Sequence, residues 1–157
     1  MLRSDRVRFR RERAAYWEDC RLSVYTEYAM SIKRSVSGTY RLAGHFGNDP
    51  HPHPLTPEQA YPLLDEAYDA RDLAWESLLL LGAPEVVDAA RDSAFTLRRT
   101  DRFARAGDRR SEEWQALLEA QRVARAGFYD AARRDLALPP GHPGRWRAGD
   151  TAGEPPV

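Results

Sequence analysis

Residues 78–90 read LLLLGAPEVVDAA, and this stretch shows where one helix ends and the next begins. Gly82 is a typical helix stop, and Pro84 is typical of the first residue of a new helix, where its missing N–H has no intrahelical acceptor. Only Ala83 lies between them. A connection this short predicts two neighbouring antiparallel helices that reverse direction here.

The helix before this turn is expected over residues 56–81. Thr56, Pro57 and Gln59 match an N-cap, a first-turn proline and a capping box. Pro62 is expected to kink the first turn or to delay the start of the helix to about Tyr61. Residues at steps of three and four predict the inward face: Ala60, Leu64, Ala67, Ala74, Leu78 and Leu81.

The helix after the turn is expected over residues 84–106, with Gly107 as its stop. Its predicted inward residues are small: Val87, Ala90, Ala94, Leu97 and Ala104, with Phe95 and Phe103 on the flanks. Such small side chains predict a close approach to a neighbouring helix. Ser111 is expected to cap one more helix, to about residue 136, with Trp114, Leu117, Gln121, Ala124, Phe128, Ala132 and Leu136 inward.

The N-terminal part of the chain predicts one long helix over about residues 4–42, which contain no proline and a single glycine, Gly38. Its expected inward residues are Trp17, Cys20, Val24, Tyr28, Ile32, Val36 and Tyr40. Residues 43–57 hold four prolines and two glycines, so they predict a loop.

Four amphipathic helices without a strand signal predict an all-α protein, an antiparallel four-helix bundle with a long first helix. At 1.5 Å per residue the first helix is longer than the others by roughly 20 Å, and we expect this excess at its N-terminus. The predicted organisation is therefore an arginine-rich helical arm over 1–14, a bundle over 15–138, and a disordered Pro/Gly-rich tail over 139–157.

Composition narrows the class of protein. The chain has 157 residues, enough for one globular domain, and its 24 basic and 24 acidic residues leave no overall positive field to attract phosphates. A single cysteine, Cys20, excludes an internal disulfide. Only Lys33 among the basic residues is lysine, a bias typical of a GC-rich genome. No run of 18 apolar residues occurs and the start lacks the apolar segment of a signal peptide, so we expect a cytoplasmic protein.

The zero net charge conceals an uneven distribution. Residues 3–41 carry ten basic and five acidic side chains, whereas residues 56–81 carry one basic and six acidic ones. Opposite charges of this kind favour the two helices as neighbours. Asp65, Asp69, Asp72 and Glu76 form an acidic stripe with three possible uses: it faces the first helix, it is a solvated face, or it binds a cation or a basic partner.

The arm contains the candidate binding residues Arg3, Arg6, Arg10 and Arg13, which follow steps of three and four and so share one face of the helix. Three uses fit such a stripe: contact with anionic lipid headgroups, contact with phosphates of nucleic acid, or a solvated helix end.

Four segments, FRRERAAYWEDCRLSVYTEYAMSIKR, LTPEQA, LLLLGAPEVVDAA and ARAGFYDAARRDL, resemble uncharacterised helical proteins of GC-rich actinobacteria. The resemblance covers roughly residues 9–138. It implies a cytoplasmic bundle, which in many of those proteins follows a membrane-spanning segment just before an arginine-rich start. It implies no catalytic residue.

Known catalytic patterns are missing from the sequence. His51 and His53 lie in the proline-rich loop near Asp49, where a metal site would need further ligands on rigid elements, so we expect exposed histidines and no metal or cofactor. Cys20 is expected to act as a small buried apolar residue. No Glu-x-x-His pair, phosphate-binding loop or nucleophile elbow occurs, and the Arg–His spacings do not match helical ribonucleases. Trp146 is expected either to dock on the bundle or to form a short contact.

The sequence therefore predicts a non-enzymatic helical interaction or scaffold domain. Its arginine-rich arm would contact a membrane surface or a protein partner, and a nucleic-acid-binding accessory protein is the alternative. A homodimer is a further hypothesis, because a helix that extends beyond its own bundle can pair with a second copy.

Overall fold

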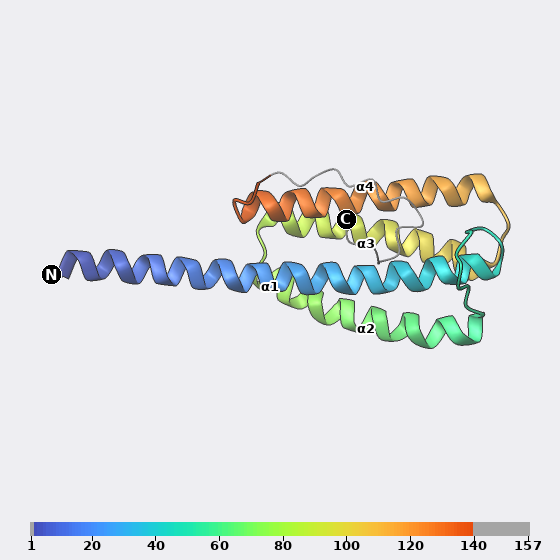
Figure 1. The fold of residues 1–157 in the computed structure, drawn as a ribbon, viewed down its shortest axis with the longest axis horizontal. Coiled ribbons are helices and arrows are strands. Elements are labelled where there is room, and N and C mark those ends of the chain that lie inside the picture. Colours follow the sequence, from blue (N-terminus) through green and yellow to red (C-terminus); the bar gives the residue numbers. More distant parts are fainter. Residues whose placement is uncertain (1, 140–157) are drawn as a thin grey trace, which may run out of the picture.

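The chain forms a bundle of four helices, each antiparallel to the one before it, and the first helix extends far beyond the bundle (Figure 1). The structure is a computed structural model that describes residues 2–139, with side chains from Asp5 onward. The helices are α1 (Leu2–His45), α2 (Pro57–Leu81), α3 (Pro84–Ala106) and α4 (Ser111–Asp135). The predicted fold class is confirmed, whereas most of the predicted tail, including His142 and Trp146, lies outside the described residues.

The helix ends follow the sequence signals with two corrections. Ser111 is the first residue of α4 and Arg110 is its N-cap, so the expected cap by Ser111 is wrong. At the start of α2 the Gln59 side-chain oxygen accepts a hydrogen bond from the Thr56 N–H at 3.2 Å. The helix begins at Pro57 and contains Pro62 in its regular part, so the expected delay to Tyr61 is wrong. Pro62 is exposed, and on this face of the helix the carbonyl of Glu58 that loses its donor can turn to water.

The turn between α2 and α3 depends on Gly82 for a spatial reason. The Gly82 N–H donates to the Leu78 carbonyl oxygen at 2.8 Å. A Cβ atom on Gly82 would lie 2.5 Å from that same oxygen, so any side chain here would force the turn to open. The predicted glycine stop is therefore confirmed, and close approach of the backbone is its cause.

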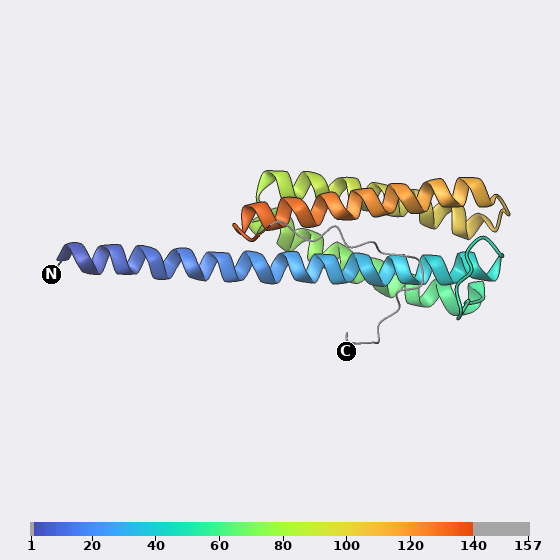
Figure 2. The same ribbon diagram turned by 45° about the horizontal axis from the view of Figure 1, so that its top comes forward.

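Helices α1 and α2 pack side by side along most of the bundle, and α3 pairs with α4 in the same way (Figures 1 and 2). The first pair packs around Gly38, where an added Cβ would lie 2.8 Å from Cδ2 of the fully buried Leu64. Large rings bridge α1 to α4: Tyr28 lies against Phe128 and Tyr40 against Trp114, with ring centroids 5.3 and 5.6 Å apart.

We expect Gly38→Val to lower the free energy of unfolding by about 1–3 kcal/mol, because an added Cβ would lie 2.8 Å from Cδ2 of Leu64, which is fully buried and would have to shift. The matched control is Gly127→Val in α4, where an added Cβ meets nothing within 4 Å, and a change within about 0.5 kcal/mol is expected. Urea unfolding of both variants measures the difference. Equal losses of unfolding free energy in the two variants would mean that helix propensity, and not the α1–α2 contact, determines the effect of the substitution.

The core consists of two apolar clusters with polar residues between them along the bundle. One cluster lies at the end from which α1 extends and includes Tyr25, Tyr28, Leu78, Val86 and Phe128; the other includes Leu42, Leu64, Phe103, Trp114 and Leu117. Thr39, Thr100 and Gln121 are buried between the two clusters, whereas the buried Ser35 and Ser93 lie among residues of the first cluster.

The buried hydroxyl groups are satisfied mainly by carbonyls of their own helices. Ser35 donates to the Ser31 carbonyl and Thr100 to the Thr96 carbonyl, and the Thr96 hydroxyl also donates to the Gln121 side-chain oxygen at 3.0 Å. Hydroxyls bonded in this way can be buried at little cost. The predicted close approach therefore depends on serine and threonine as well as on alanine.

Three predictions about inward faces are wrong. Trp17 is 44% exposed because it lies beyond the end of the bundle. In α3, Val86 is fully buried while Val87 is half-buried. Phe103 is buried rather than on a flank, because its ring stacks on Trp114 with centroids 5.9 Å apart.

Candidate functional site

The N-terminal part of α1 projects from the bundle as a single helix, as Figures 1 and 2 show from two directions. We call residues 2–19 the arm. Every described side chain from Asp5 to Asp19 is exposed, and Cys20 is the first that is half-buried. The arm is thus longer than the predicted range of 1–14, and the bundle begins near Cys20.

A polar cluster sets the point where the arm leaves the bundle. Arg21 donates from Nε to the Leu81 carbonyl at 3.2 Å and approaches Asp135 at 3.4 Å. The Tyr25 hydroxyl donates to Asp135 at 2.6 Å and accepts from the Ala83 N–H at 3.0 Å. These contacts tie α1 to the α2–α3 turn and to the end of α4. They join residues about 60 and 110 positions apart, so local sequence patterns gave no signal for them.

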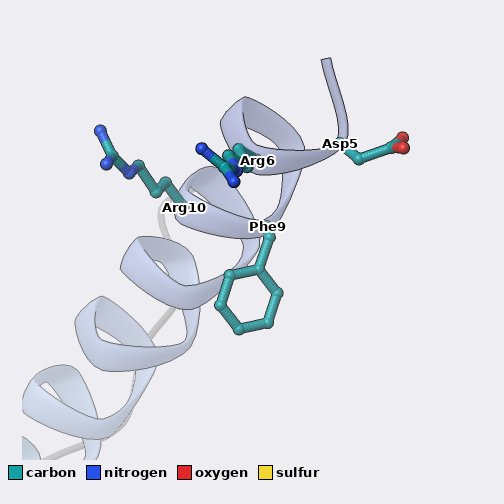
Figure 3. A pocket seen from close by; sticks show the side chains of 4 residues that line it. All are labelled: Asp5, Arg6, Phe9 and Arg10. Atoms are coloured by element: carbon teal, nitrogen blue, oxygen red, sulfur yellow. The ribbon is translucent and has the colours of Figure 1, made fainter. Parts of the chain in front are cut away.

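The arginine stripe is present on the arm. Figure 3 shows Arg6 and Arg10 on one side of the helix, with Phe9 and Asp5 pointing in other directions. Arg13 follows at the same spacing and is exposed. Arg3 belongs to α1, but its side chain lies outside the described side chains.

The stripe continues the buried face of α1 beyond the bundle. Steps of three and four lead from Arg3, Arg6, Arg10 and Arg13 through Trp17 and Cys20 to the buried Val24 and Tyr28. Inside the bundle this face contacts the other helices, and on the arm the same face is cationic and uncovered. A partner of the arm would therefore occupy the position that the bundle helices occupy further along α1.

The acidic residues of the arm lie away from the stripe. At 3.6 residues per turn, Asp5, Glu12, Glu18 and Asp19 all fall outside the sector of Arg6, Arg10 and Arg13. Glu12 pairs with Arg8 at 2.8 Å on another side of the helix. The stripe is instead bordered by exposed apolar side chains, of which Phe9 is 64% and Trp17 44% exposed. The arm thus presents a narrow cationic and aromatic face.

The hollow at Asp5, Arg6, Phe9 and Arg10 lies on this one helix (Figure 3). All four lining residues come from two turns of α1, and all are exposed. Such a surface can contact another macromolecule, but it does not enclose a small substrate as a pocket between elements does.

The acidic stripe of α2 faces solvent. The side chains of Asp65 and Asp72 are 72% and 70% exposed, and Asp69 and Glu76 are exposed as well. Leu73 and Leu80 lie on the same face and are exposed. We call these six residues the acidic ridge. The stripe therefore faces away from α1, and the reading in which it faces the first helix is wrong.

The proline-rich loop has a structural use. Asp49 is buried and accepts a hydrogen bond from the Trp114 indole N–H at 3.1 Å. Burial raises the pKa of this carboxyl, and the hydrogen bond from Trp114 opposes that effect. His51 accepts a hydrogen bond from the His53 N–H within the loop. His53 is exposed as expected, whereas His51 is half-buried. Within residues 2–139 no group of three His, Cys, Asp or Glu side chains is placed to hold a metal ion.

A second polar cluster lies between α2 and α3, and its charged members were not predicted. Arg105 pairs with Asp101 at 2.8 Å and with Asp65 at 3.6 Å, and its guanidinium lies 4.8 Å from the Tyr61 ring centroid. Arg71 covers Tyr68 in the same manner at 4.5 Å. These contacts hold the two helices together, so we assign the cluster a structural role.

Comparisons with known proteins give no relative: no family model, no curated protein and no solved structure matches this chain. None of the helices in the described part of the chain has a stretch long and apolar enough to cross a membrane. Fold and site together define the class as an all-α four-helix bundle with a projecting, arginine-rich helical arm.

Proposed function

We propose that this protein is a non-enzymatic helical interaction module whose arm binds an acidic surface of a protein partner. The observation that carries the proposal is the arm itself. From Asp5 to Asp19 every side chain is exposed, although the face bearing Arg6, Arg10 and Arg13 continues the packed face of the bundle.

A single helix that packs against no other element lacks the main source of helix stability. Isolated helices shorter than about 12–15 residues are marginally stable in water, and most helix stability in proteins comes from packing. The bundle supports only one end of the arm, at Arg21 and Tyr25. A partner helix along the stripe would supply the missing packing.

The charge pattern favours a protein over a lipid or nucleic-acid surface. Residues 2–19 contain six arginines and four acidic residues, so the net charge of the whole arm is only +2. A membrane or a duplex presents negative charge over a broad area and would also meet these carboxylates, which reduces the attraction. A row of carboxylates on a partner helix, by contrast, contacts only the arginine stripe and not the acidic residues on the other sides of the arm.

A nucleic-acid-binding accessory protein is the second candidate. The observation in its favour is the exposed aromatic set Phe9, Tyr16 and Trp17 beside the arginines. Aromatic side chains next to arginines can stack on unpaired bases while the guanidinium groups contact phosphates. Contact with anionic headgroups, which would associate the protein with a membrane surface, uses the same arginines.

Charge reversal on the arm tests the proposal with three probes: poly-L-glutamate, vesicles containing phosphatidylserine, and a 20-nucleotide single-stranded DNA. We expect the full chain to bind poly-L-glutamate at low salt, and we expect R6E/R10E/R13E to weaken this binding about tenfold or more. The control R99E/R102E reverses two exposed arginines of α3 and is expected to bind as the unchanged chain does.

Titration by fluorescence anisotropy provides the measurement. Unchanged poly-L-glutamate binding by the triple arm variant would overturn the proposal. Tighter, arm-dependent binding of DNA would establish the second candidate instead, and tighter, arm-dependent binding of vesicles would establish a membrane contact.

A further inference from the structure

We infer that the acidic partner of the arm is a second copy of this chain, with the arm of each copy lying along the acidic ridge of α2 in the other. The inference rests on the proposed function, which assigns binding to the arm, and it names the surface that the arm binds.

Charge complementarity is the first argument. The ridge presents Asp65, Asp69, Asp72 and Glu76, and all four are exposed. The basic residue of α2, Arg71, is only 11% exposed; it lies over Tyr68 and pairs with Asp72 at 2.8 Å, as Arg105 of α3 pairs with Asp65 at 3.6 Å. The arm presents Arg6, Arg10 and Arg13 without an acidic residue among them. The exposed carboxylates of the ridge, above all Asp69 and Glu76, thus face an arm stripe of the opposite sign at helical spacing.

The apolar side chains within the two rows also correspond. Phe9 stands beside Arg6 and Arg10 and is 64% exposed. On the ridge, Leu73 lies between Asp69 and Glu76 and is 72% exposed, and Leu80 is 80% exposed. Single exposed apolar residues are common on protein surfaces. A large apolar residue at the border of each of two oppositely charged rows, however, lets a helix–helix contact combine apolar packing with charge pairing.

A two-fold axis allows both copies to make the same arm–ridge contact. The arm leaves the bundle at the end where α2 stops, close to Leu81 (Figure 1). Because α1 and α2 are antiparallel within one copy, a two-fold axis beyond that end places each arm parallel to α2 of the other copy. Both arms and both ridges are then used once, which is the closed, self-complementary arrangement of a C2 dimer.

The length of the arm sets the register. Phe9 is ten residues from the base of the arm at Asp19, and Leu73 is eight residues from the end of α2 at Leu81. At 1.5 Å per residue, Phe9 lies about 15 Å from the base of its arm and Leu73 about 12 Å from the end of its α2. With the base of each arm placed at the end of α2 in the other copy, Phe9 therefore lies next to Leu73. Arg6 and Arg10 then flank the stretch from Asp69 to Glu76.

Sedimentation velocity of the full chain at about 50 mM salt is the test. A dimer is expected, and R6E/R10E/R13E and D69R/E76R are each expected to sediment as monomers. The variant that combines all five changes restores opposite charges and is expected to sediment as a dimer again. The control D92R/D130R reverses two exposed acidic residues outside the ridge and is expected to leave the dimer intact.

A disulfide provides an independent measurement. In a Cys20→Ser background, F9C/L73C is expected to form a disulfide-linked dimer on mild oxidation. F9C/V123C, which uses the exposed Val123 of α4, and F9C alone are expected to form no disulfide-linked dimer. All the altered residues apart from the half-buried Cys20 are exposed, so each variant is expected to fold. Circular dichroism of the helical signal verifies this.

A monomeric wild-type chain, or a dimer that survives ridge reversal, would overturn the inference. The proposed function is judged separately by poly-L-glutamate binding. If the arm variant loses that binding while the wild-type chain is monomeric, the arm is a binding surface for another protein and the self-pairing is wrong.

Discussion

Replacing Trp114 by alanine is expected to lower the free energy of unfolding by about 3–5 kcal/mol, the largest single-residue effect in the bundle. Trp114 is fully buried, stacks on Phe103 and meets the edge of Tyr40. Its indole N–H also donates to the buried Asp49. The alanine variant loses the packing of three helices and leaves the Asp49 carboxylate without this donor, a second penalty.

Two further variants separate these causes. Trp114→Phe retains most of the ring packing and removes the indole donor, so a smaller loss of about 1–3 kcal/mol is expected. Trp17→Ala removes an exposed tryptophan from the arm and is expected to change stability by less than about 0.5 kcal/mol. Urea unfolding followed by circular dichroism measures all three. A large loss for Trp17→Ala would mean that the arm is packed against something in solution.

Unfolding at alkaline pH is the second large effect. Burial raises the pKa of Tyr28 to about 12 from its ordinary value of 10.0, and Tyr25 and Tyr40 are raised to about 12 chiefly by burial as well. A raised pKa means that the unfolded chain loses the tyrosine proton first. The stability is therefore complete below pH 10 and declines as the pH rises towards 12.

Tyr28 alone is expected to remove about 3 kcal/mol of stability across that interval, since two pKa units correspond to about this energy. Tyr25 and Tyr40 act in the same direction. Urea unfolding at pH 9, 10 and 11, together with tyrosinate absorbance, provides the measurement. Tyr28→Phe keeps the ring contacts with Trp75 and Phe128, and it should reduce the pH dependence by one proton. A stability that is flat from pH 9 to 11 would contradict the assignment.

The predictions that came true concern signals that act within a few residues. Gly82-Ala83-Pro84 located the α2–α3 turn, and Thr56 with Gln59 located the start of α2. Helical spacing also predicted the buried face of α4, where Trp114, Gln121 and Phe128 are all buried. Spacing and capping depend only on neighbouring residues, so one sequence contains the information.

The candidate site was predicted in part. Arginine spacing predicted that Arg6, Arg10 and Arg13 share a stripe, because a regular helix determines which residues lie on the same side. The spacing did not predict that the arm would be exposed as far as Asp19. That limit depends on Arg21 and Tyr25, which bond to Leu81, Ala83 and Asp135 in other helices.

The sequence by itself thus determined the number and type of the helices, the tight turn and the cationic face of the arm, since these follow from local backbone preference and helical period. Only the tertiary structure decided where the bundle ends, that Asp49 supports Trp114, and that the acidic ridge of α2 faces solvent. Each of those outcomes depends on contacts between residues far apart in the chain. Their distances and burial come from how the helices pack, which no local pattern encodes.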